Sequence, residues 1–298
     1  MTQASRRAEK TVDLTIAPHQ KDLGDGFTVR RVLPAIERRM LGPFVFFDHF
    51  GPTVLRAGSG LDVRPHPHIG LATVTYLFAG EILHRDSLGT AQTIEPGAVN
   101  WMTAGRGIVH SERTPTASRS HDNPIFGIQS WVGLPREKEE TDPDFAHYPA
   151  EILPAVEGEG LLARVIAGSA FGKTSPVAAL SPTLYADVTM AAGALLEIPA
   201  GYAERAAYPV EGAVEADGQS YAAGQMMVFH PKAKAVLRAT APARLLLLGG
   251  EPLDGPRHVW WNLVSSSPER IEQAKRDWKA GCFPKVPGDE TEFIPLPS

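Results

Sequence analysis

The feature that most constrains the fold is the way glycine and proline divide this chain into short apolar runs. Among the 298 residues there are 28 Gly and 26 Pro, a share above the average for globular proteins and without a fixed period. The runs between them are rich in β-branched and aromatic residues, as in Phe27-Thr28-Val29 and Phe44-Val45-Phe46-Phe47. Such runs, bounded by turn residues, are typical of antiparallel strands. We therefore predict an all-β fold.

A polar segment divides the chain into two halves with the same strand pattern. Residues 135–154 contain the charge run Arg136-Glu137-Lys138-Glu139-Glu140, and strand-like runs resume at Leu161. Charge runs of this kind are usually solvated connectors. The chain length suits two domains or one large unit. We place a boundary here and predict an N-terminal domain of residues 1–140 and a C-terminal domain of residues 141–298.

One helix is predicted near the end of the chain. Ser267 is a suitable N-cap, and Ile271 and Ala274 fall on one face of the helix that would follow. Gly281 is positioned to end it. The tail of residues 283–298 contains four prolines, so we expect it to be extended and to lie over another surface.

Charge and hydropathy exclude several classes of partner. With 29 Lys+Arg against 34 Asp+Glu and no basic run, the chain is predicted not to bind nucleic acid directly, although a protein partner remains open. No apolar run approaches the ~18 residues of a membrane helix, and Met1–Lys10 lacks the apolar core of a signal peptide. The single cysteine, Cys282, excludes an internal disulfide. We expect a cytoplasmic protein that makes no membrane contact.

The histidines are concentrated in the first half. Six of the ten lie between His49 and His121, whereas only His230 and His258 follow residue 147. Any metal chemistry is therefore expected in the first half. His84 belongs to this group and could line the pocket or hydrogen-bond a ligand, but we favour its interpretation as an ordinary strand histidine. Asp48 and His49 could either support a metal ligand or form a structural turn.

Two short motifs carry the metal hypothesis, His66-Pro67-His68 and His110-Ser111-Glu112. Residues two apart on a strand project from the same face, so each motif can direct two side chains into one space. Facing strands in a small barrel would unite three imidazoles and one carboxylate. That set suits a divalent first-row metal with positions left open for substrate, water or O₂. The alternative is that these are unrelated surface or core histidines.

The surrounding residues resemble the two motifs of the cupin superfamily. Gly60, Gly80 and both histidines between them match the first motif, but Thr73 stands where a glutamate is usual. The second motif matches through its glycine and histidine, with Thr114 where asparagine is usual. A carboxylate is instead present at Glu112, two residues after His110.

With its carboxylate at Glu112 and several longer matching segments, the chain resembles the pirin family of bicupins. The resemblance covers most of the chain and rests on Pro43–Asp48, Pro65–Gly70, Thr73–Leu77, Trp101–Glu112 and Trp260–Asn262. It implies two cupin (double-stranded β-helix, or jelly-roll) barrels in tandem with one short C-terminal helix. It also implies a metal in the first barrel and none in the second.

In the family the metal is held by the residues that match His66, His68, His110 and Glu112. The resemblance implies one divalent ion, usually iron(II), with Mn, Ni, Cu, Co and Zn as alternatives. Pirin-like proteins include oxygenases that resemble quercetin 2,3-dioxygenase. Such an enzyme opens the central ring of a flavonol with O₂ and releases carbon monoxide. Its substrate would be a small aromatic molecule, and Glu112 would be the catalytic base.

Two other functions remain open. The protein could be a non-catalytic, metal-dependent redox sensor that binds a transcription factor or a metabolic enzyme, with the metal biasing an interface. Alternatively, the metal could be structural. The same four ligands would serve all three functions, so the sequence does not separate them.

Overall fold

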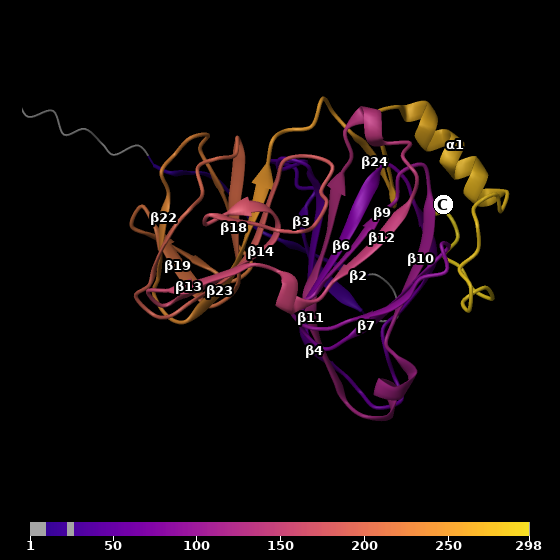
Figure 1. The fold of residues 1–298 in the computed structure, drawn as a ribbon, viewed down its shortest axis with the longest axis horizontal. Helices are drawn as coiled ribbons and strands as arrows, with labels where there is room; N and C mark the ends of the chain where they lie inside the picture. The colour runs from indigo at the N-terminus through magenta and orange to yellow at the C-terminus, as the bar shows by residue number, and fades with distance from the viewer. Residues whose placement is uncertain (1–9, 23–26, 298) are drawn as a thin grey trace, which may run out of the picture.

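The computed structural model describes residues 10–22 and 27–297 and shows two β-barrels side by side (Figure 1). Each barrel is built from one large and one four-stranded antiparallel sheet. Both the all-β prediction and the tandem-barrel prediction are confirmed. In the part of the chain that is described, no helix has the length and apolar character needed to cross a membrane.

The first barrel joins a seven-stranded sheet, ordered β12-β9-β6-β11-β4-β3-β2, to a four-stranded sheet, ordered β5-β10-β7-β8. The larger sheet contains β2 (His19–Asp22), β3 (Thr28–Leu33), β4 (Phe44–Leu55), β6 (Leu71–Ala79), β9 (Val99–Thr103), β11 (Asn123–Gly133) and β12 (Asp144–Tyr148). The smaller sheet contains β5 (Asp62–His68), β7 (Ile82–Asp86), β8 (Ala91–Ile94) and β10 (Ile108–Arg113).

The second barrel joins an eight-stranded sheet to a four-stranded sheet, ordered β17-β22-β19-β20. The larger sheet contains β1 (Val12–Ile16), β13 (Ala155–Gly158), β14 (Leu161–Ala170), β15 (Lys173–Thr174), β16 (Thr183–Met190), β18 (Glu204–Glu211), β21 (Met226–Phe229) and β23 (Ala243–Gly250). The smaller sheet contains β17 (Leu195–Glu197), β19 (Ala213–Ala216), β20 (Gln219–Ala222) and β22 (Val236–Ala239). Single turns of 3₁₀ helix occupy η1 (Thr116–Ser120), η2 (Arg136–Lys138) and η3 (Ala150–Ile152).

The barrels exchange segments at both ends of the described chain. Strand β1 pairs antiparallel with β21 in the second barrel. After the second barrel, the hairpin of β24 (His258–Trp260) and β25 (Leu263–Ser265) returns to the first, where Leu263 bridges to Ile69. Gly70 adopts a φ of 67°, and a Cβ there would lie 2.0 Å from the carbonyl oxygen of Val264. The hairpin therefore packs directly on the backbone beside His68.

The predicted C-terminal helix is confirmed as α1 (Pro268–Lys279). Ser267 caps it by accepting a hydrogen bond from the Arg270 N–H, and Ile271 and Ala274 are buried. The tail that follows has no regular secondary structure and runs along the first barrel, where the Ile294 N–H donates to the Pro65 carbonyl at 2.8 Å. The prediction that the tail lies on another surface is thus confirmed, but the tail is not extended throughout, because a turn closed by the Asp289 N–H and the Val286 carbonyl interrupts it.

The two large sheets pack on each other through one shared hydrophobic cluster. Edge-to-face aromatic pairs cross it, with ring centroids 5.2 Å apart for both Phe44–Tyr185 and Phe47–Tyr208. Such pairs contribute about 1 kcal/mol each beyond the burial of their area. A polar contact joins the same surfaces, because the Tyr76 hydroxyl donates to Asp187 at 2.8 Å. The barrels therefore share a core.

The prediction of a solvated connector at residues 135–154 is wrong for part of its charge run. Glu139 is only 5% exposed, and its carboxylate pairs with the buried Arg257 at 2.7 Å. It also accepts hydrogen bonds from Ser265 and Ser266, which lie just before the helix. A buried carboxylate needs such partners to offset its desolvation. The segment thus anchors the returning hairpin to the first barrel.

Candidate metal centre

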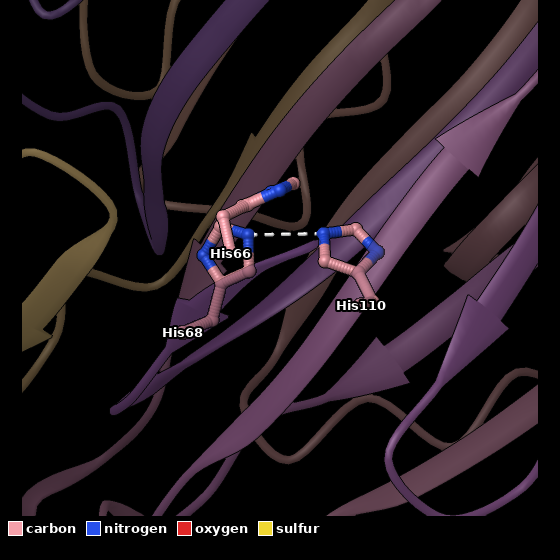
Figure 2. Close-up of side chains that lie close together, drawn as sticks. All are labelled: His66, His68 and His110. Carbon is pink, nitrogen blue, oxygen red and sulfur yellow. Dashed lines mark hydrogen bonds between the residues drawn. The ribbon is translucent and has the colours of Figure 1, made fainter. Parts of the chain in front are cut away.

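Strands β5 and β10 bring the three histidines of the two sequence motifs together. In their antiparallel ladder His66 lies directly opposite His110, and His68 lies two residues further along the same strand face. The candidate ligand nitrogens of the three rings all lie within 4.8 Å of one another. Figure 2 shows the rings converging, with Nε2 of His68 and Nε2 of His110 only 3.1 Å apart. The sequence hypothesis that these two motifs meet is confirmed for the imidazoles.

Backbone carbonyls fix the proton of two of these rings. Nδ1 of His66 donates to the Arg64 carbonyl at 2.8 Å, and Nδ1 of His68 donates to the Asn262 carbonyl at 3.0 Å. A carbonyl oxygen only accepts, so the proton of each neutral ring lies on Nδ1 and the lone pair on Nε2. Both lone pairs are therefore available to an ion held between the rings.

Burial keeps these imidazoles neutral. Desolvation lowers the pKa of His66 to about 4 and, with the neighbouring imidazoles, the pKa values of His68 and His110 well below the ordinary value. The neutral ring is the form that binds a metal. Lone pairs facing each other in a buried space need an electrophile between them, and three imidazole nitrogens suit a divalent first-row ion. The donor set fits the metal that the fold family implies.

Glu112 lies near this group but outside it. A bulge in the β5–β10 ladder after His110 shifts its register. Its buried carboxylate accepts a hydrogen bond from the Thr75 hydroxyl at 3.0 Å and is also bonded by Gln129. Burial raises the pKa of Glu112. Among the described residues the closely spaced donor group contains only the three histidines, so the role of Glu112 as fourth ligand stays a prediction.

An aromatic wall borders the histidines and was not predicted. Trp131 on β11 meets His68 edge-on, with ring centroids 5.2 Å apart, and Phe46 on β4 stacks on Trp131 at 3.9 Å. Gln129 and Trp131 are two residues apart on one strand. That spacing, the same signal that linked His66 to His68, would have placed both side chains on the face that meets the site.

Asp48 and His49 match neither of their predicted alternatives. Both lie within β4, not in a turn. Asp48 forms an ion pair with Arg31 at 2.8 Å, and His49 contacts Tyr208 of the second barrel. His49 therefore joins the two barrels, whereas Asp48 pairs β4 with β3 inside the first barrel.

Comparisons with known proteins agree with this architecture. The family model Pirin matches residues 26–132, and the model Pirin C-terminal cupin domain matches residues 185–284. A pirin-like protein of Caulobacter vibrioides is 52% identical over 96% of this chain and 99% of its own length. A Pseudomonas aeruginosa protein provisionally named quercetin 2,3-dioxygenase is 38% identical over 87% of this chain and 81% of its own.

A solved structure extends the likeness to three dimensions. The crystal structure of a quercetin 2,3-dioxygenase from Acinetobacter baumannii superimposes with a TM-score of 0.89 and 34% identity. The alignment covers 96% of this chain and 95% of that one. With two family models matched in order and relatives aligned over nearly the full length, the chain belongs to the pirin family.

Proposed function

We propose that this protein is a metal-dependent oxygenase of the quercetin 2,3-dioxygenase type, which cleaves a flavonol or a related enolisable aromatic with O₂. The observation that carries the proposal is the convergence of three buried, neutral imidazoles beside an aromatic wall. The likeness to the Acinetobacter baumannii enzyme supports the same reaction class. The chemistry would reside in the first barrel, whose strands β5 and β10 carry all three histidines.

The ion would be held by Nε2 of His66, His68 and His110, with the Glu112 carboxylate as fourth ligand. We propose iron(II), and the same donors would accept Mn, Ni, Cu, Co or Zn. A bound ion of this kind lowers the pKa of a coordinated hydroxyl and provides a centre for O₂ chemistry.

Glu112 would accept the proton of the substrate hydroxyl. Its burial raises its pKa, which makes the carboxylate a stronger base near neutral pH. The Thr75 hydroxyl, which donates to Oε1 of Glu112, would orient the carboxylate during that transfer. Trp131 would present its ring to a flat substrate, because stacked aromatic groups exclude water and fix a plane.

The second barrel would have no metal. An apolar cluster fills it, drawn from both of its sheets and including Leu196, Val214 and Leu245. In the described part of the chain, the one group of three or more potential ligand side chains lies in the first barrel. The second barrel would therefore serve as a structural partner.

Oxygen uptake by the iron-loaded protein with quercetin tests the proposal. Turnover is expected, and the His66→Ala variant is expected to lose both bound iron and uptake. Metal content and circular dichroism of the variant separate a lost ligand from a lost fold. A wild-type protein with full iron occupancy and no uptake with quercetin or related flavonols would refute the oxygenase and leave the regulatory function, which partner capture would then test.

A further inference from the structure

The third ligand, His110, faces a side chain that the sequence analysis set aside. Its outer nitrogen, Nδ1, lies 3.4 Å from Nδ1 of His84 on the neighbouring strand β7. The other nitrogen of His84, Nε2, lies 2.9 Å from Oδ2 of Asp86. All three residues are at most 3% exposed. Asp86, His84 and His110 thus form a buried row that ends at the proposed metal site.

The Asp86 carboxylate fixes which nitrogen of His84 faces His110 as an acceptor. A carboxylate only accepts, so Nε2 of His84 donates to Asp86, and Nδ1 is left as the nitrogen of His84 that can accept. When Nδ1 of His110 donates to this nitrogen, the lone pair of His110 is left on Nε2. This is the nitrogen that faces Nε2 of His68. In this arrangement His84 leaves the lone pair of His110 on Nε2, just as the Arg64 and Asn262 carbonyls do for His66 and His68.

Packing holds the row in place. Phe145 on β12 stacks on the His84 ring, with centroids 4.4 Å apart and planes 22° apart. The backbone N–H groups of Leu88 and Thr90 donate to Oδ1 of Asp86 at 2.9 and 3.1 Å. One oxygen of Asp86 is thereby committed to the turn after β7, and the other is free to hold His84.

We propose that His84 and Asp86 are positioning residues that fix the proton and the ring orientation of His110 for metal binding. This inference rests on the metal centre proposed above, but not on its oxygenase activity. Outer partners of metal-bound histidines commonly alter metal affinity by about 10–100-fold. Here the partner is a histidine backed by a carboxylate, so removing either member should weaken binding without removing a ligand.

Zinc affinity, measured by competition with a chromophoric chelator, gives the first test. His84→Phe keeps an aromatic ring against Phe145 but removes the acceptor, and we expect its zinc dissociation constant to rise by about 10–100-fold. His84→Gln offers a side-chain oxygen to His110 and should recover most of the loss. His147→Phe, a half-buried histidine on β12 that bonds to Asn100, is the matched control and should bind zinc as the wild type does.

Asp86→Asn is the sharper variant because it is nearly the same size. The Leu88 and Thr90 N–H groups need an acceptor, so the amide oxygen of the variant side chain should point toward them and its NH₂ toward His84. His84 would then carry its proton on Nδ1, and His110 would be driven to protonate Nε2, the nitrogen needed by the metal. We expect zinc affinity to fall at least as far as in His84→Phe.

Nitrogen-15 NMR of the imidazoles gives a readout that a purely structural role would not change. In the zinc-free protein, the His110 tautomer protonated on Nδ1 should be more populated in the wild type than in Asp86→Asn, where the Nε2-protonated tautomer should gain. Unchanged tautomers and unchanged zinc affinity in both variants would overturn the inference while leaving the metal centre intact. Wild-type protein that binds no zinc would overturn the metal centre and the inference together. Tight zinc binding without oxygenase activity would count only against the proposed reaction.

Discussion

His49 makes the stability of this protein depend on pH at the junction of the barrels. The side chain is 0% exposed, with Nε2 2.8 Å from the Arg30 guanidinium and Nδ1 2.9 Å from the Tyr208 hydroxyl. A guanidinium only donates, so Nε2 accepts and His49 is neutral. Burial and the charge of Arg30 lower the pKa of His49 from 6.5 to about 3.

The sign of the effect follows from this lowered pKa. Below about pH 6.5 the unfolded chain takes up a proton at His49 that the folded protein refuses, so the free energy of unfolding falls as the pH falls toward about 3. At about pH 5 the pH is about 1.5 units below the pKa of His49 in the unfolded chain, so the unfolded chain carries this proton and the folded protein does not. At about 1.4 kcal/mol per unit, His49 alone should cost about 2 kcal/mol between about pH 7 and about pH 5.

His49→Gln isolates this contribution. Glutamine can accept from Arg30 and donate to Tyr208, but it does not titrate. Urea unfolding at several pH values, with the zinc-free wild type and variant side by side, should show the wild type losing about 2 kcal/mol more than the variant over that range. The other histidines contribute equally to both proteins and cancel in the difference. Equal slopes for the two proteins would refute the assignment of a neutral, buried His49.

Three further substitutions probe other parts of the fold. Ser267→Ala removes the cap of α1 and should lower the free energy of unfolding by about 1 kcal/mol, measured by chemical denaturation. Gly70→Ala places a Cβ against the returning hairpin and should lower the free energy of unfolding by at least about 3 kcal/mol. Its control, Gly58→Ala, has a φ of 85° but no neighbour within reach of a Cβ, so it should lose only about 1–2 kcal/mol. Similar losses in the two variants would contradict the close packing at Gly70. Tyr76→Phe removes the donor to Asp187 and should cost about 1 kcal/mol in thermal unfolding, and an unchanged melting temperature would argue against that contact.

The parts of this molecule that follow from local chemistry were predictable from the sequence. Turn residues between β-branched runs indicated the strands, and a serine before an apolar helical stripe indicated α1. The His66–His68 and His110–Glu112 pairs could be placed on strand faces because the period of a strand is two. Their meeting needed only that the two strands be neighbours.

What could not be predicted depends on strand register and on distant segments. Nothing local to His84 shows that it lies beside His110, since that requires the pairing of β7 with β10. The Asn262 carbonyl that bonds His68 follows the whole second barrel in the sequence, and no spacing rule links residues so far apart along the chain. Glu139 looked like one charge among several, because its buried partner Arg257 is supplied by another part of the chain.

The returning hairpin has a consequence for the order in which the protein matures. Domains generally fold as they leave the ribosome, N-terminal part first. His66, His68 and His110 are synthesised early, but the carbonyl that orients His68 belongs to Asn262, which follows the whole second barrel. The first barrel therefore waits for late-synthesised residues before all three ligands are set. We expect metal loading to follow chain synthesis, when the finished protein and not a nascent fragment meets the ion.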